Sequence, residues 1–178
     1  LLYRGGARED RKDEFFVGHR TLTTAGNTPK PIQTGFEMLS QLKQLRLKVD
    51  GSKAGGRIGM LATKNKNNMF TLLVYNYNET DYDLSLSDKI EINLNGLNSQ
   101  KLQVKEIVLD RNNNNTYREW QRQGKPRNSS VADMQKMKEA GDLTITNQYL
   151  LETDNGHANL NLSLPRHSMV LVNIVVLN

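Results

Sequence analysis

Residues 57–77 read RIGMLATKNKNNMFTLLVYNY, and this stretch decides the fold. Its two ends, residues 57–63 and 69–77, are short runs of aliphatic and aromatic residues with strong β propensity. The polar residues 65–68 between them are typical of the turn in a β-hairpin. The stretch therefore predicts two antiparallel strands that are neighbours in one sheet.

Four further segments continue this pattern along the chain. Residues 89–94, KIEINL, alternate strictly between polar and apolar side chains, which is typical of a half-buried strand. Residues 101–109, 159–164 and 168–177 also predict strands, the last of them long and rich in β-branched residues. Because strands and helices do not alternate, the sequence favours an antiparallel β-sandwich over a parallel sheet.

An amphipathic helix is predicted near the start of the chain, within residues 29–42, and prolines stand at its beginning. Residues 1–28 before it predict a loop, a short extended piece and a turn at Gly26-Asn27. The apolar side chains of the helix recur at intervals of four, three and three, and we expect them to form one buried stripe. They are Ile32, Phe36, Leu39 and Leu42.

A second helical region is predicted as an insertion at about residues 116–141. A short helical turn begins near Thr116 and is stopped by Gly124 and Pro126. Ser130 is a plausible N-cap of the next helix, and Gly141 is its stop signal. The fold class is therefore mainly β: a sandwich with an N-terminal helix and a short helical insertion.

Composition limits the classes of function. A chain of 178 residues fits one domain with a short appendage, and the absence of cysteine excludes disulfides and thiolate zinc sites. The net charge is +5, but the basic residues are scattered along the chain and interleaved with acidic ones. A solvated surface of mixed charge is therefore a better interpretation than nucleic-acid binding. No apolar run has the length of about 20 residues that a membrane span needs. There is no signal peptide pattern, and the opening LLY indicates a fragment or a processed chain.

The residues do not assemble a complete catalytic site by themselves. The three histidines, His19, His157 and His167, are far apart and lack metal-ligand spacing, so we expect no metal and no cofactor. Acidic pairs lie in charged runs or polar loops, where salt bridging is the favoured interpretation. Trp120 could stack on a sugar or a base, but a core position is favoured. Whatever catalysis the chain serves therefore needs residues outside it.

Four Asn-x-Ser/Thr sequons are candidate glycosylation sites if the protein passes through a eukaryotic secretory route. In a chain this rich in asparagine, chance alone could produce most of them. They are Asn78, Asn114, Asn128 and Asn161.

Three stretches, in this order, resemble the C-terminal part of family 39 glycoside hydrolases, the β-xylosidase and α-L-iduronidase family. The first is HRTLTT at residues 19–24 followed by PKPIQTGFEMLSQL at 29–42, which is similar to the end of the catalytic barrel. The second is LD at 109–110 followed by YREWQRQGKP at 117–126 and a helix at 131–140. The third is LPRHS at 164–168 leading into the last strand. Of the two kinds of enzyme in the family, the α-L-iduronidases resemble this sequence somewhat more than the β-xylosidases do.

The resemblance implies two parts: residues 1–47 as the end of an (α/β)8 barrel, including its last helix, and residues 48–178 as the β-sandwich. It also implies an upstream barrel with two catalytic glutamates that retain anomeric configuration, neither of which matches a position in this chain. The partners are then that barrel, in the same protein or as a processed partner chain, and a glycan or glycoside substrate, with neither nucleic acid nor membrane.

One functional residue carries over by the resemblance. Arg20 matches an arginine that, in iduronidases, faces the active site and holds the carboxylate of the substrate. A guanidinium suits this role because it binds a carboxylate through two hydrogen bonds; pairing with an acid at the barrel rim is the alternative. This chain has Arg4-Gly5-Gly6 where the family has an acidic residue that contacts substrate, so its choice of substrate could differ.

The leading hypothesis is the C-terminal portion of a retaining glycosidase that supports the barrel and contributes one rim residue. The alternative is a free-standing carbohydrate-binding or adhesion module without catalysis. The glycosidase hypothesis implies a lysosomal or secreted protein if the source is eukaryotic, and a secreted or periplasmic one if it is bacterial.

Overall fold

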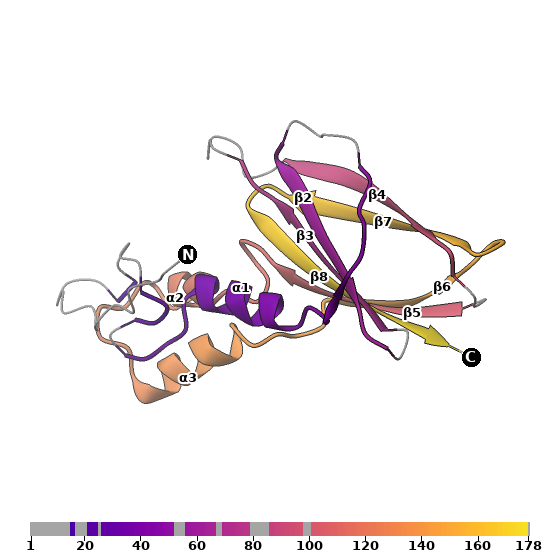
Figure 1. Ribbon diagram of the computed structural model, residues 1–178. Helices are drawn as coiled ribbons and strands as arrows, with labels where there is room; N and C mark the ends of the chain where they lie inside the picture. Colours follow the sequence, from indigo (N-terminus) through magenta and orange to yellow (C-terminus); the bar gives the residue numbers. More distant parts are fainter. Residues whose placement is uncertain are drawn as a thin grey trace.

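The computed structural model describes residues 15–16, 21–24, 26–51, 56–66, 69–78, 86–97 and 101–177. Their strands form two antiparallel sheets packed face to face, and three short helices lie together at one end (Figure 1). This confirms the predicted β-sandwich with an N-terminal helix and a helical insertion. None of the helices in the described ranges is long and apolar enough to cross a membrane.

The larger sheet has six strands in the order β1-β2-β3-β8-β5-β6, and the smaller sheet pairs β4 with β7. The predicted hairpin is β2 and β3, which pair from Ile58↔Asn76 to Lys64↔Phe70, and part of its turn, Asn67-Asn68, lies outside the described residues. The bounds are β1 Leu45–Arg46, β2 Ile58–Lys64, β3 Met69–Asn76, β4 Ser87–Asn95, β5 Lys101–Leu109, β6 Asn147–Glu152, β7 His157–Pro165 and β8 Ser168–Leu177.

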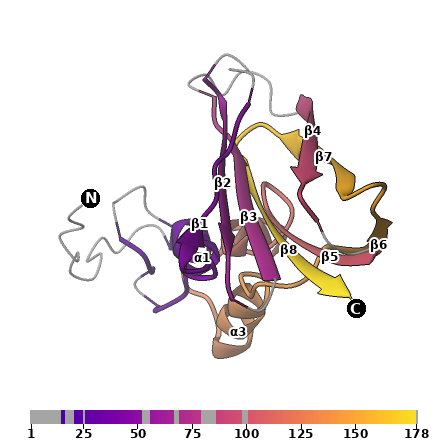
Figure 2. The same cartoon turned by 45° about the vertical axis from the view of Figure 1, so that its right-hand side comes forward.

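The main core lies between the two sheets and follows from the alternation of side chains. On β7, Ala158, Leu160, Leu162 and Leu164 are buried while the residues between them are exposed. Central strand β3 is instead buried on both faces, because its even-numbered residues face the small sheet and Leu73 faces the helices. Figure 2 shows β4 and β7 on one side of β2 and β3, and α1 (Pro31–Ser40) on the other.

Helix α1 buries a different face from the one that its apolar stripe predicts. Thr34, Gly35 and Met38 are its buried residues, and Met38 packs with Leu73, Ile107 and Leu171 of the large sheet. The Thr34 hydroxyl donates to the carbonyl of Gly141 in the insertion at 3.3 Å, and Gly35 lies next to Leu109 of the large sheet, so contacts with the insertion and with the sheet select the buried face. Of the expected stripe, only Leu42 packs against this cluster. The other three residues form what we call the outer face of α1, and they are exposed to 57%, 46% and 37%: Ile32, Phe36 and Leu39.

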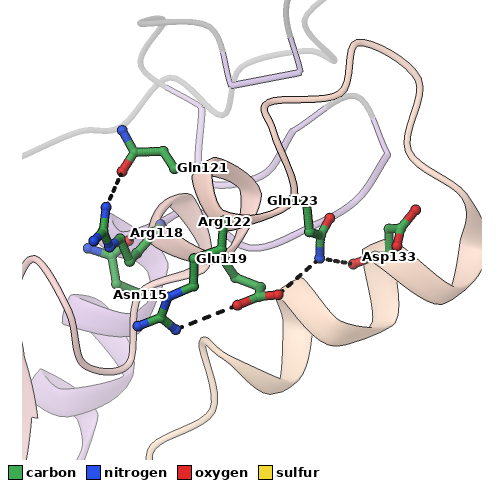
Figure 3. A network of polar contacts seen from close by, with 7 residues as sticks. All are labelled: Asn115, Arg118, Glu119, Gln121, Arg122, Gln123 and Asp133. Atoms are coloured by element: carbon green, nitrogen blue, oxygen red, sulfur yellow. Dashed lines mark hydrogen bonds and ion pairs between the residues drawn. The ribbon is translucent and has the colours of Figure 1, made fainter.

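The insertion folds into a helical hairpin of α2 (Thr116–Arg122) and α3 (Val131–Glu139). The side chain of Asn115 accepts a hydrogen bond from the Arg118 N–H and caps α2. Ser130 caps α3 as predicted, with its Oγ 3.1 Å from the Asp133 nitrogen. Figure 3 shows the polar contacts that join the two helices.

Gln123 is the link in this hairpin. Its amide donates 3.2 Å hydrogen bonds both to Glu119 on α2 and to the main-chain oxygen of Asp133 on α3. Glu119 also forms an ion pair with Arg122, at 3.6 Å. These contacts join the end of α2 to α3 within the insertion.

The sequence analysis did not predict strands β1 and β6, and each omission has a physical reason. Strand β1 is only two residues long. Strand β6, NQYLLE, lies at the edge of the large sheet, where Leu150 is 60% exposed, so its apolar run does not alternate like that of a half-buried strand. Its Tyr149 hydroxyl donates to Glu106 at 2.8 Å; burial first, and then this neighbouring carboxylate, raise the pKa of Tyr149 above its usual range.

The two faces of α1 should respond differently to truncation in residues 1–178. Met38→Ala should lower the free energy of unfolding by about 2–5 kcal/mol, because Met38 is completely buried and leaves a cavity. Ile32→Ala on the outer face should cost about 1 kcal/mol or less. Urea denaturation of both variants measures the difference, and equal losses would show that the face assignment is wrong.

Candidate functional site

The predicted site residue Arg20 lies outside the described residues, but residues 21–24, which follow it, are described. Leu22 accepts a hydrogen bond from the Lys30 N–H at 2.8 Å, and Thr24 donates to the Thr28 carbonyl at 2.9 Å. Residues 21–24 and 28–30 thus form a small hairpin that leads directly into α1. The predicted turn is present: Asn27 has a φ of 60°, and its N–H donates to the Thr24 carbonyl.

Lys30 fixes the start of this hairpin. It is 7% exposed, and its Nζ donates to Thr21 Oγ1 at 2.7 Å. A buried ammonium group is costly unless it is hydrogen-bonded, so this contact constrains Thr21 as well as Lys30.

Ahead of Arg20, the chain is held by the insertion. Phe15, Trp120 and Met137 form a buried cluster, and Phe16 packs against it. The Phe16 ring lies 5.4 Å from both the Tyr117 and the Trp120 rings, between centroids. The described residues on both sides of Arg20 are therefore fixed: Phe15 and Phe16 by the insertion, and Thr21 by Lys30.

Trp120 is a core residue of this cluster, in agreement with the favoured interpretation of the sequence. It is 8% exposed, and its Nε1 donates to the Pro126 carbonyl at 3.0 Å. The Gly-x-Pro segment after α2 thus supplies the hydrogen-bond acceptor that a buried indole needs. The sequence analysis missed Phe15 and Phe16; a pair of adjacent phenylalanines in a charged segment was the available signal.

The titratable groups of the described part are not gathered into a catalytic cluster. His157 binds Asn95 at 2.8 Å, and His167 lies in the β7–β8 turn with its ring against Tyr77; His19 lies outside the described residues. Asp88 accepts from Asn76, while Glu106 and Glu119 have the partners given above. The described residues contain no group of three histidine, aspartate or glutamate side chains able to hold a metal ion.

The four sequons lie in different environments. Asn114 is 6% exposed: its Nδ2 donates to the Val108 and Thr144 carbonyls, and its Oδ1 accepts from the Thr144 N–H. A glycan would replace one of the two Nδ2 hydrogens that make these bonds and would need space around a buried side chain, so the folded chain does not accommodate one there. Asn128 and Asn161 are exposed and Asn78 is half-buried, and these three stay candidates for glycosylation.

Comparison with known proteins identifies the family. The family model described as glycosyl hydrolases family 39 matches residues 7–153, whereas no curated protein matches the chain. The fold is similar to that of a family 39 enzyme from Xanthomonas axonopodis pv. citri, with a TM-score of 0.75 at 12% identity over 93% of this chain and 34% of that one. A monomeric β-xylosidase from Caulobacter crescentus CB15 gives a TM-score of 0.73 at 13% identity, with the same two coverages.

A third solved structure is similar over less of its length. A bacterial orthologue of human α-L-iduronidase gives a TM-score of 0.65 at 16% identity, over 84% of this chain and 27% of that one. The chain thus spans about a third or less of these solved structures. Since the family model matches most of the sequence, the chain belongs to glycosyl hydrolases family 39.

Proposed function

We propose that residues 1–178 are the C-terminal portion of a retaining glycosidase whose catalytic glutamates lie outside them. Residues 1–47 are the closing elements of its (α/β)8 barrel, and β1 at their end joins them to the large sheet of the sandwich. Residues 48–178 are a β-sandwich that supports the barrel. The family membership and the length of the solved relatives support this proposal. The observation that carries it is the outer face of α1, where Ile32, Phe36 and Leu39 lie exposed on a helix whose other face is firmly packed.

Covering this face is worth a substantial free energy. Full burial of one large apolar side chain contributes about 1.5–3 kcal/mol, and roughly half of each of these three is still exposed, so their burial adds on the order of 3 kcal/mol. The rest of the barrel is the partner we assign to this face. The sandwich, through Met38 and the insertion, then holds the helix in the orientation that the barrel needs.

In this proposal Arg20 is the one residue of the chain that reaches the substrate. Its guanidinium binds the carboxylate of a uronic acid through two hydrogen bonds, which orients the sugar for attack by a nucleophile of the barrel. The packing of Phe15, Phe16 and Thr21 supports this role, because a positioning group must be held on a rigid support. The alternative role for Arg20 is a salt bridge to an acid at the barrel rim.

A second candidate function, a carbohydrate-binding module without catalysis, is favoured by a different observation. Tyr75 and Tyr77, at the end of β3, are 40% and 57% exposed on the sheet face that also carries α1. Exposed tyrosines on a flat sheet can stack on sugar rings. Binding of xylo-oligosaccharides to residues 1–178 that is lost with Tyr77→Ala would favour this function over the glycosidase.

The proposed barrel contact predicts a context-dependent effect of Phe36→Asp. In residues 1–178 the change should alter the free energy of unfolding by about 1 kcal/mol or less, because the side chain is already half exposed. In the complete polypeptide it should cost about 3–5 kcal/mol, since an unpaired charge would then lie inside an apolar interface. Thermal or urea denaturation of both forms measures this difference.

The matched control is Gln44→Asp, which places the same charge at an exposed position just beyond α1. It should leave the stability of both forms unchanged. Equal tolerance of Phe36→Asp in the two forms would show that nothing in the complete polypeptide covers the outer face.

If Arg20 binds the carboxylate of the substrate, its removal should lower kcat/KM only for substrates that carry a carboxylate. In the complete enzyme, Arg20→Ala should lower kcat/KM for 4-methylumbelliferyl α-L-iduronide by roughly 10–100-fold, the equivalent of a lost charged hydrogen-bond pair. Any activity on the β-xyloside, which has no carboxylate, should stay unchanged. Equal losses on both substrates would assign Arg20 to a structural salt bridge instead.

A further inference from the structure

Two Asn-Gly pairs meet at one end of the small sheet. Asn95-Gly96 stands at the end of β4, and Asn155-Gly156 forms the turn that leads into β7. Asn95 lies opposite His157 in the last residue pair of the β4–β7 ladder, and the Leu97 N–H donates to the Gly156 carbonyl at 3.0 Å. Both asparagines are exposed. Two dipeptides of the same sequence thus lie close together in surroundings that differ.

An asparagine that precedes glycine can deamidate through its own backbone, because no side chain of the glycine obstructs the attacking nitrogen. The glycine nitrogen adds to the side-chain Cγ, and negative charge develops on Oδ1 in this step. The side-chain amide then leaves as ammonia, with the proton given up by the attacking nitrogen, and a cyclic imide is closed. Water opens the imide at either carbonyl and leaves aspartate or isoaspartate, so the reaction needs water alone.

The surroundings of Asn95 favour this addition. The Nδ1 atom of His157 lies 2.8 Å from Asn95 Oδ1, and because an amide oxygen only accepts hydrogen bonds, Nδ1 carries the hydrogen of this contact. A donor placed on the oxygen where charge develops stabilises the transition state. Gly96, which supplies the attacking nitrogen, stands outside the ladder with a φ of 74°. Asn95 and His157 are both exposed, so water reaches the imide.

The surroundings of Asn155 oppose the same addition. Asn155 and Gly156 have φ values of 47° and 79°, as in a type I′ turn, and reciprocal 2.8 Å hydrogen bonds between the main chains of Asp154 and His157 close this turn. The two bonds hold the backbone against the rotation that attack requires. The Asn155 amide nitrogen donates to the Asp154 carboxylate at 3.0 Å, and this nearby negative charge disfavours a second one on the amide oxygen.

We propose that Asn95 is a site of spontaneous deamidation, promoted by the hydrogen bond from His157, and that the adjacent Asn155-Gly156 pair reacts more slowly. The aspartate product would place a carboxylate against the His157 ring. The isoaspartate product would lengthen the backbone by one methylene group where β4 ends, and so displace the segment that follows. This inference goes beyond the proposed glycosidase function and does not depend on it.

The rates at the two asparagines can be compared within one sample of the complete polypeptide. After incubation at neutral pH, peptide mass spectrometry measures the loss of asparagine at each position. Asn95 should react at least about threefold faster than Asn155, because one hydrogen bond to the developing charge contributes a factor of this order. In urea the two rates should converge, since the unfolded dipeptides are alike. Equal rates in the folded protein, or a faster reaction at Asn155, would overturn the proposal.

The variant His157→Val tests the assisting group, because valine suits an exposed strand position but donates no hydrogen bond. It should lower the rate at Asn95 in the folded protein by about 2–10-fold and leave the rate in urea unchanged. The matched control is Ser163→Val, which makes a similar change at another exposed position of β7 and should not alter the rate at Asn95. A rate at Asn95 that is unchanged or higher in His157→Val would overturn the proposal.

Discussion

The packing of Met38 onto the large sheet is the interaction on which the rest of the structure depends. Met38 is completely buried against Leu73, Ile107 and Leu171, and it covers the second face of the central strands. The same helix binds the insertion, since the Thr34 hydroxyl donates to the Gly141 carbonyl just after α3. One ten-residue helix therefore connects the sandwich, the insertion and the N-terminal segment.

Because α1 is fixed in this way, its outer face has a fixed orientation too. Residues 28–30 of the small hairpin lead directly into α1, and Phe15 and Phe16 pack on the insertion, so these described parts lie at the helical end of the molecule (Figure 1). The apolar outer face of α1 is a surface that the chain does not cover with its own described residues.

Sequence analysis predicted those elements in which the pattern of apolar and polar residues matches the burial of the side chains in the structure. Strand β7 alternates because one face meets the core, and α3 begins at Ser130 because its hydroxyl caps the helix. Strand β6 was not found, because at a sheet edge an exposed Leu150 interrupts the pattern. The face that α1 buries depends on its contacts with the large sheet and with Gly141, which are distant in sequence, and helical periodicity contains no information on these partners.

The candidate site was less predictable than the fold, for physical reasons. Arg20 came from a resemblance, and the role proposed for it depends on groups outside the chain. Asn114 stands in a sequon and in a polar run, yet a φ of 51° turns it inward to bind Val108 and Thr144, which are distant in sequence. The packing of Phe15 on Trp120 likewise joins segments about a hundred residues apart, which a single sequence does not pair.

The most direct test of the account measures hydrolysis of 4-methylumbelliferyl α-L-iduronide and β-xyloside by residues 1–178 and by the complete polypeptide, at equal molar concentration. The account predicts release of the fluorophore from at least one substrate by the complete polypeptide and none by residues 1–178. Hydrolysis by residues 1–178 alone would contradict it, because the catalytic acids would then lie within this chain.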